Sequence, residues 1–205
     1  MRELHYKKMG SGSPLIVLHG LLGSLDNWLS IGKILAEYFE VYLMDQRNHG
    51  KSFHSNEFSY EILCSDLYNF FEQHEIAKAN ILGHSMGGKV AMLFALNYPD
   101  KTNHLIVSDI APVDYADKHT HILKALTAID LSVYGTRQEI EEALRSGLPG
   151  EDERVIQFLM KGLYRNELNQ FAWRYNVNAI IDAYDDISRF EKPKGKIFWG
   201  KTLFI

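Results

Sequence analysis

The chain has 205 residues, of which 46% are hydrophobic and 23% charged, and its formal net charge at pH 7 is -4. This length allows one substantial core with an inserted subdomain, and the composition is that of an ordinary soluble globular protein. The net negative charge predicts no general attraction to nucleic acid or to anionic membranes. No apolar run is long enough to cross a bilayer.

The cysteine content and the N-terminal residues indicate the compartment. The one cysteine, Cys64, excludes an internal disulfide framework and is compatible with a reducing environment. The first residues lack the apolar stretch of a signal peptide. We therefore expect a cytoplasmic protein that does not associate with membranes.

The first half of the chain alternates predicted strands and helices. The short continuous apolar run at residues 15–18 is typical of a strand that is buried on both faces, and residues 41–44, 79–82 and 105–108 are further predicted strands. Apolar residues recur at helical spacing from Trp28 to Tyr38, again over 63–71 behind a capping Ser59, and over 88–96 before Pro99. This alternation predicts a mostly parallel sheet with helices on both faces.

The alternation stops between residues 115 and 190. This stretch predicts consecutive helices over 121–131, 137–145, 153–163 and 178–184, with a turn at 147–150. A helical block inserted between strands suits a lid over a site at the strand ends, although a purely structural subdomain has the same composition. Strand-like patterns resume at 197–198 and 202–205. We predict a core over 1–114, a lid over 115–190 and a return to an incomplete core sheet over 191–205.

The strongest chemical signal is the G-x-S-x-G pattern of residues 83–87, which lies between a predicted strand and a predicted helix. A serine hydroxyl is a poor nucleophile unless it is exposed, aligned and next to a base. A sharp strand-to-helix turn exposes it, and side chains at Gly83 and Gly87 would clash in such a turn. We predict that Ser85 is a catalytic nucleophile facing a cavity under the lid.

A second signal, residues 19–23 (His-Gly-Leu-Leu-Gly), follows the first buried strand. A tetrahedral intermediate needs two donors for its developing oxyanion, and in this arrangement one comes from the residue after the nucleophile and one from such a loop. The backbone amides of Met86 and Leu21 are therefore the predicted oxyanion hole. We expect His19 to brace this loop rather than to act as the catalytic base.

Four motifs occur together in a recognisable order. They are His19-Gly20 with residues 23–27, residues 45–52 (Asp-Gln-Arg-Asn-His-Gly-Lys-Ser), residues 83–88, and residues 109–115 (Asp-Ile-Ala-Pro-Val-Asp-Tyr). In this order they resemble the small bacterial YbfF-like esterases of the α/β-hydrolase superfamily, over nearly the whole chain. The resemblance implies the α/β-hydrolase fold and hydrolysis of short acyl esters or acyl thioesters such as acyl-CoA, without a cofactor or a metal.

The resemblance and the strand positions together assign the acid of the catalytic triad. Asp109 follows the predicted strand 105–108, which places its carboxylate at the sheet edge where Ser85 emerges, and it matches the acid of the family. We expect Asp114 to cap the entry to the lid instead. For Asp45 and Arg47, in a turn at another strand end, we expect a structural ion-paired loop.

Residues of the lid and of the nucleophile turn are candidates for substrate contact. Residues 171–176 (Phe-Ala-Trp-Arg-Tyr-Asn) match the family, so Trp173 and Tyr175 are candidates to line an acyl pocket. Arg174 is a candidate partner for an acidic ligand group or a lid carboxylate. His84 is a further candidate beside Ser85. Plain packing is the alternative for each single lid residue.

The catalytic histidine of the family lies beyond the strand matched by residues 202–205, and this chain ends before it. None of the nine histidines present is a convincing replacement, and only His119 and His121 could swing toward Ser85. We therefore expect slow hydrolysis by this chain and self-association through an incomplete sheet edge. Two other functions remain open: a C–C bond hydrolase or menaquinone-pathway lyase on the same scaffold, and a binding protein without catalysis.

Overall fold

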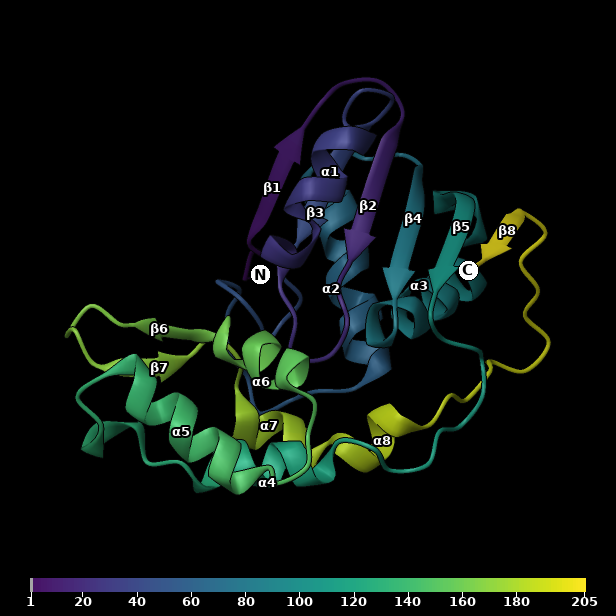
Figure 1. Cartoon of the computed structure of the whole chain (residues 1–205). Helices are drawn as coiled ribbons and strands as arrows, with labels where there is room; N and C mark the ends of the chain where they lie inside the picture. Colours follow the sequence, from purple (N-terminus) through teal and green to yellow (C-terminus); the bar gives the residue numbers. More distant parts are fainter. Residues whose placement is uncertain (1) are drawn as a thin grey trace.

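The computed structural model describes residues 2–205, and its centre is a six-stranded sheet in the order β1-β3-β2-β4-β5-β8 (Figure 1). The strands are β1 (Tyr6–Met9), β2 (Pro14–Leu18), β3 (Glu40–Met44), β4 (Ala79–His84), β5 (Thr102–Ser108) and β8 (Lys201–Phe204). All neighbours pair in parallel except β1, which runs antiparallel to β3. The predicted mostly parallel sheet is confirmed. The sequence pattern missed β1, because this half-exposed edge strand has no continuous apolar run.

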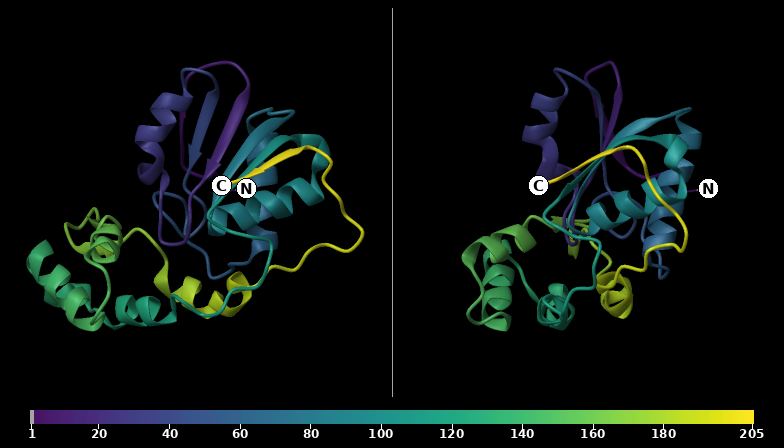
Figure 2. Two further views of the ribbon diagram at one scale, coloured as in Figure 1. Left: turned by 45° about the vertical axis from the view of Figure 1, so that its right-hand side comes forward. Right: turned by 90° about the vertical axis from the view of Figure 1, so that its right-hand side faces the viewer.

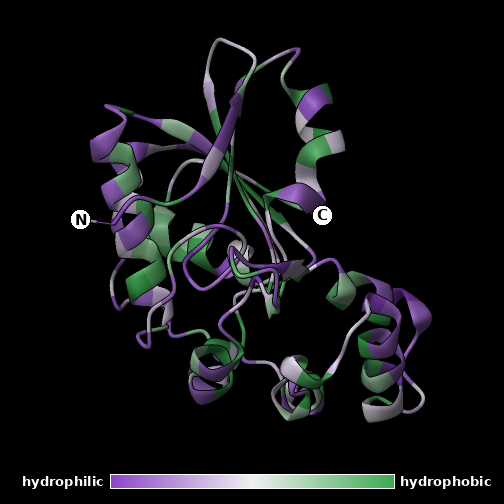
Figure 3. Cartoon of the chain, turned by 90° about the vertical axis from the view of Figure 1, so that its left-hand side faces the viewer, coloured by the Kyte–Doolittle hydropathy of each residue, from purple (hydrophilic) through white to green (hydrophobic). Residues whose placement is uncertain are grey.

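Helices cover both faces of the sheet, as Figure 2 shows. The short η1 (Leu25–Trp28) and α1 (Leu29–Leu35) cover one face, and α2 (Tyr60–Gln73) and α3 (Met86–Asn97) cover the other, followed by η2 (Pro99–Lys101). Along β2, Leu15 and Val17 belong to one buried cluster, and Ile16 and Leu18 to the other. This alternation follows from the period of two residues in a strand. In Figure 3 the central strands are mostly hydrophobic.

The start of α2 follows the sequence prediction, whereas the apolar spacing near α1 does not mark a buried face. The Ser59 side chain accepts a hydrogen bond from the Ile62 amide and so caps α2. Ile31 is 48% exposed, and Tyr38, 71% exposed, lies beyond the end of α1. The periodic apolar residues there therefore contribute little to the core.

Residues 115–190, here called the insertion, lie beyond the carboxyl ends of the parallel strands (Figure 1). Their elements are α4 (Thr120–Ala128), η3 (Leu131–Val133), α5 (Arg137–Gly147), α6 (Glu153–Met160), β6 (Leu163–Arg165), β7 (Phe171–Trp173), α7 (Val177–Asp182) and α8 (Tyr184–Ser188). The prediction of helices alone was wrong, because β6 and β7 form an antiparallel hairpin. Its turn is stabilised by the Asn166 side chain, which accepts hydrogen bonds from the amides of Leu168 and Gln170.

A long connection leads from α8 back to β8, which pairs with β5. The predicted strand at residues 197–198 is wrong, since these residues lie in this connection. The short apolar pattern there instead reflects Phe198, which packs against the main core cluster. Within residues 2–205, no helix combines the length and the apolar character needed to cross a membrane.

Candidate active site

Ser85 occupies a strained turn between β4 and α3. Its backbone φ of 51° and ψ of -119° are unfavourable for a residue with a side chain. A Cβ atom at Gly83 would lie 2.2 Å from the carbonyl oxygen of Gly87, and one at Gly87 would lie 2.5 Å from that of Leu18. The predicted sharp turn is confirmed, and both flanking glycines are required by close backbone approach.

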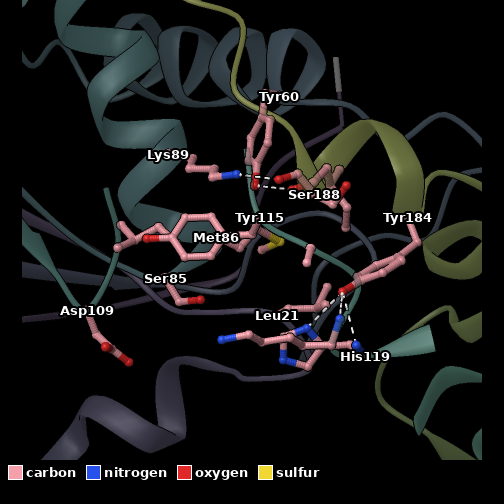
Figure 4. A pocket seen from close by; sticks show the side chains of 14 residues that line it. Leu21, Tyr60, Ser85, Met86, Lys89, Asp109, Tyr115, His119, Tyr184 and Ser188 are labelled. Atoms are coloured by element: carbon pink, nitrogen blue, oxygen red, sulfur yellow. Dashed lines mark hydrogen bonds between the residues drawn. The ribbon is translucent and has the colours of Figure 1, made fainter. Parts of the chain in front are cut away.

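Ser85 lines a cavity of about 280 Å³ between the sheet and the insertion (Figure 4). The wall on the core side includes Leu21, Met86 and Asp109, and the wall on the insertion side includes His119 and Tyr184. The segments that follow β2, β4 and β5 therefore meet around Ser85, together with the entry to the insertion. The strand ends of a parallel sheet are where ligands bind in such folds.

Leu21 and Met86, whose backbone amides are the predicted oxyanion hole, both line this cavity. Within residues 2–205, neither amide donates a hydrogen bond to a protein group. Met86 is the first residue of α3, so its amide also lies at the positive end of the helix dipole. Both predicted donors thus belong to residues that line the Ser85 cavity, and their role as an oxyanion hole stays a prediction.

Two buried histidines brace the loop that carries Leu21. The His19 ring donates from Nδ1 to the Gly20 carbonyl (2.8 Å), and its Nε2 accepts from the Gln46 amide (3.1 Å). The His49 ring accepts from the Leu22 amide through Nε2 (3.1 Å). Burial lowers the pKa of His19 to about 4 and that of His49 to about 3, so both rings are neutral near pH 7. The bracing role predicted for His19 is confirmed.

The turn after β3 is an ion-paired structural loop, as predicted. The buried Asp45 carboxylate accepts hydrogen bonds from the Leu25 and Lys51 amides, at 2.7 and 2.9 Å, and pairs with His5 at 2.8 Å. The Arg47 guanidinium pairs with the Asp66 carboxylate. This loop holds the base of η1 against the strand ends.

Asp109 lines the same cavity as Ser85, and among residues 2–205 the basic side chain nearest its carboxylate is His84. Asp109 directly follows β5 with a positive φ of 55°, and its amide donates to the Ile205 carbonyl at 2.8 Å. Its side chain is 87% exposed, and His84 Nε2 lies 3.8 Å from its Oδ2 atom. Its carboxylate is therefore available to another group. His84 is half-exposed beside Asp109 but does not line the cavity.

Asp114 does not cap the first helix of the insertion, which corrects the sequence prediction. α4 begins only at Thr120, and Asp117 accepts hydrogen bonds from the amides at its start. Asp114 instead accepts a hydrogen bond from the Phe190 amide at 2.8 Å. It therefore joins the entry of the insertion to its exit.

The three candidates from the family-like segment 171–176 do not line the cavity of Ser85. Tyr175 is buried, and its hydroxyl donates to the Leu159 carbonyl at 2.8 Å, while Trp173 stacks on it. The Arg174 guanidinium lies over the Tyr164 ring at 4.3 Å and borders a separate polar cavity. Their contacts are packing contacts within the insertion and at its edge.

His119 and His121 differ in their relation to Ser85. His119 lines the cavity, but its Nδ1 is hydrogen-bonded to the Tyr184 hydroxyl (3.0 Å), and burial lowers its pKa. His121 pairs with Glu151 at 2.6 Å and does not line the cavity. In the described part of the chain, no histidine hydrogen-bonds the Ser85 hydroxyl, and no three His, Cys, Asp or Glu side chains form a group that could hold a metal ion.

Sequence reasoning missed Lys89, Tyr115 and Tyr184, which also line the cavity. A signal existed for Lys89, because it is the one charged residue within the otherwise uncharged segment 86–95. The two tyrosines lie in segments whose sequence has no periodicity that points toward Ser85. Only the tertiary fold brings them there.

Comparisons with known proteins agree with this geometry. The family model described as alpha/beta hydrolase fold matches residues 13–181. Esterase YbfF of Escherichia coli (strain K12) is 37% identical over 89% of this chain and 69% of that protein. The sn-1-specific diacylglycerol lipase ABHD11 of Danio rerio is 36% identical over 96% of this chain and 63% of that protein. The structure of a marine microorganism esterase superposes with a TM-score of 0.94 at 41% identity, covering 100% of this chain and 80% of that one. The protein therefore belongs to the alpha/beta-hydrolase fold family, as a hydrolase related to its esterases.

Proposed function

We propose that this protein is a serine hydrolase that cleaves short-chain carboxylic esters or acyl thioesters, including acyl-CoA, through an acyl-Ser85 intermediate. The observation that carries the proposal is that Ser85, in its strained turn, lines one cavity with Leu21 and Met86, whose amides have no protein partner within residues 2–205. Relatives named as an esterase and a diacylglycerol lipase support ester cleavage as the reaction type.

The chemistry follows from this arrangement. The Ser85 oxygen attacks the carbonyl carbon while its proton passes to a base, and the carbonyl oxygen becomes an oxyanion held by the Leu21 and Met86 amides. Collapse of this intermediate breaks the bond to the alcohol or thiol, which leaves with the proton from the base. Water then attacks the acyl-serine in the same way, and the acid is released.

The general base and its orienting acid are part of the proposal. Among the histidines of residues 2–205, none contacts the Ser85 hydroxyl through a hydrogen bond, and the family resemblance assigns the base to a loop after the strand matched by β8. We propose that the base is the histidine that the family resemblance places in this loop. The exposed Asp109 carboxylate, beside the cavity, is its proposed orienting partner.

The proposal concerns small-molecule substrates in the cytoplasm. The cavity of about 280 Å³ suits a short acyl group rather than a macromolecule. The free, buried Cys64 is consistent with a reducing compartment.

The test compares this chain with a form extended through the family's histidine loop. Both are assayed with p-nitrophenyl esters of increasing acyl length, with acyl-CoAs and with vinylogous diketones. We expect the extended form to hydrolyse the short esters and thioesters about a thousandfold faster than this chain. Cleavage of diketones alone would contradict ester hydrolysis. Equal rates in the two forms would assign the base to a histidine within this chain, with His119 as the first to replace.

A further inference from the structure

Lys89 is a buried cation close to Ser85 that the proposed chemistry does not use. It lies one helical turn after Ser85 in α3, is only 2% exposed, and lines the same cavity. Burial lowers its pKa, and the Asp114 carboxylate acts in the opposite direction. Within residues 2–205, no carboxylate lies within ion-pair distance of its Nζ atom. A buried ammonium group is costly unless its protons are bound, so its actual partners indicate its role.

The partners of Lys89 are backbone carbonyls at the exit of the insertion. Its Nζ atom donates to the carbonyl oxygen of Ser188 at 2.8 Å (Figure 4) and to that of Arg189 at 3.0 Å. The rings of Tyr60 and Tyr115 lie against the ammonium group, at 5.7 and 5.1 Å. One side chain of the nucleophile helix is therefore bonded directly to the segment where the insertion ends.

Other groups hold the same exit segment, residues 187–190. The Tyr60 hydroxyl donates to the Ile187 carbonyl at 2.6 Å, and the Tyr115 amide donates to the Ser188 carbonyl at 3.1 Å. The Phe190 amide donates to Asp114 at 2.8 Å. The entry and exit of the insertion are thus tied to each other and, through Lys89, to α3. Ile187 and Ser188 also form part of the cavity wall.

We propose that Lys89 is a positioning residue that fixes the exit segment of the insertion relative to Ser85 and thereby sets the cavity wall that contacts the acyl substrate. Its effect on catalysis rests on the proposed function, whereas its effect on the exit segment does not. The side chain touches no reacting atom in this role. By holding the exit segment in one position, Lys89 fixes the part of the cavity wall formed by Ile187 and Ser188, which favours small acyl groups of one size.

The first test is hydrogen exchange of the whole chain with Lys89→Met, which keeps an unbranched side chain one atom shorter but removes its donors. The Tyr115 and Phe190 amides should exchange about tenfold faster or more than in the unchanged protein, while the α3 amides stay protected. Lys101→Met is the matched control, because Lys101 also contacts two aromatic rings, Tyr68 and Phe71, but donates to Glu72 away from the insertion. It should leave both amides unchanged.

The second test is kinetic, in a form that hydrolyses esters. Lys89→Met should raise KM for short acyl esters more than it lowers kcat and should weaken the preference for one acyl length. Lys89→Gln retains donor N–H groups without the charge, so its KM should rise less than that of Lys89→Met. It is used in place of Lys89→Met if that variant does not fold. Unchanged exchange at Tyr115 and Phe190 in the folded variant, or an equal effect of Lys101→Met, would overturn the proposal. Absence of any ester hydrolysis would instead contradict the proposed function and leave the exchange test valid.

Discussion

At the scale of single residues, the candidate site depends on the backbone conformation of Ser85. Its unfavourable φ persists because neighbouring hydrogen bonds determine it from both sides: its amide donates to the Ser108 carbonyl at 2.9 Å, and its carbonyl accepts from the Gly88 amide at 2.8 Å. The strained residue is thus tied to β5 and to its own helix. The same contacts place Asp109, the residue after Ser108, beside the cavity.

Gly83→Ala tests the close packing of this turn. The new methyl group would lie 2.2 Å from the Gly87 carbonyl oxygen, which is backbone and cannot move away cheaply. We expect a loss of about 3 kcal/mol or more in the free energy of unfolding, measured by urea denaturation. Gly147→Ala in α5 is the control, since its methyl would make ordinary contact with Ala125 at 3.5 Å. Equal stability of both variants would show that the turn tolerates a side chain at Gly83.

Asp109→Asn tests the acid of the triad. Its carboxylate is exposed, so the fold should be unaffected, and circular dichroism melting should be unchanged. In a form with its base, turnover should fall about a thousandfold or more because the imidazole loses its orienting anion. Asp130→Asn, at an exposed position in the insertion, should keep full activity. Near-normal turnover of Asp109→Asn would move the acid to another residue.

At the scale of elements, the loop after β2 shows how two buried histidines preorganise a backbone amide. His19 holds the Gly20 carbonyl and His49 holds the Leu22 amide, so the backbone of the intervening Leu21, which lines the cavity, is fixed on both sides. Both rings must stay neutral, because Nε2 of each accepts a hydrogen bond from an amide.

These histidines predict a stability that depends on pH. Their pKa values of about 4 and 3 in the folded protein lie below the usual 6.5, so the unfolded chain takes up protons first as the pH falls. Their contribution to stability is therefore complete above pH 6.5 and is lost on acidification, down to about pH 4 for His19 and about pH 3 for His49. Between pH 7 and 5, before most carboxylates titrate, the free energy of unfolding should fall by about 2 kcal/mol for each of the two histidines. Denaturation of His19→Gln should show a weaker pH dependence, and a flat profile for the unchanged protein would contradict the account.

The sequence predicted those elements whose apolar pattern is strong and local. The buried strands β2 and β3 were found from runs of four apolar residues, and β4 and β5 from shorter apolar runs next to Asn80 and Ser108. The turn at Ser85 was found from its glycine-flanked serine. The hairpin of β6 and β7 was missed, since three-residue strands give no alternation to detect. Lys89 and Tyr184 were missed as cavity residues because their place depends on how the insertion packs on α3.

At the scale of the whole molecule, the outer strand β8 presents an apolar edge. It pairs with β5 on one side, and Leu203, Phe204 and Ile205 are each more than half exposed. Trp199, just before the strand, is 86% exposed. Unpaired strand edges with bare apolar side chains associate with other edges.

We therefore expect this chain to dimerise or aggregate at micromolar concentrations, as measured by light scattering after size exclusion. Phe204→Lys should reduce association, because a charge at the edge disfavours strand addition. Leu168→Lys, at a residue that is 77% exposed in the hairpin turn, should leave association unchanged. A monomeric chain over the whole concentration range would contradict self-association through β8.

The most direct test of the central claim is to identify the residue that carries the acyl group. The extended form is mixed with p-nitrophenyl butyrate, quenched in acid within the first turnovers, digested and mapped by mass spectrometry. The account predicts one butyryl group on the peptide that contains Ser85, and neither this adduct nor p-nitrophenol release above background in Ser85→Ala. A butyryl group on another residue, or equal p-nitrophenol release by Ser85→Ala, would contradict catalysis by an acyl-Ser85 intermediate.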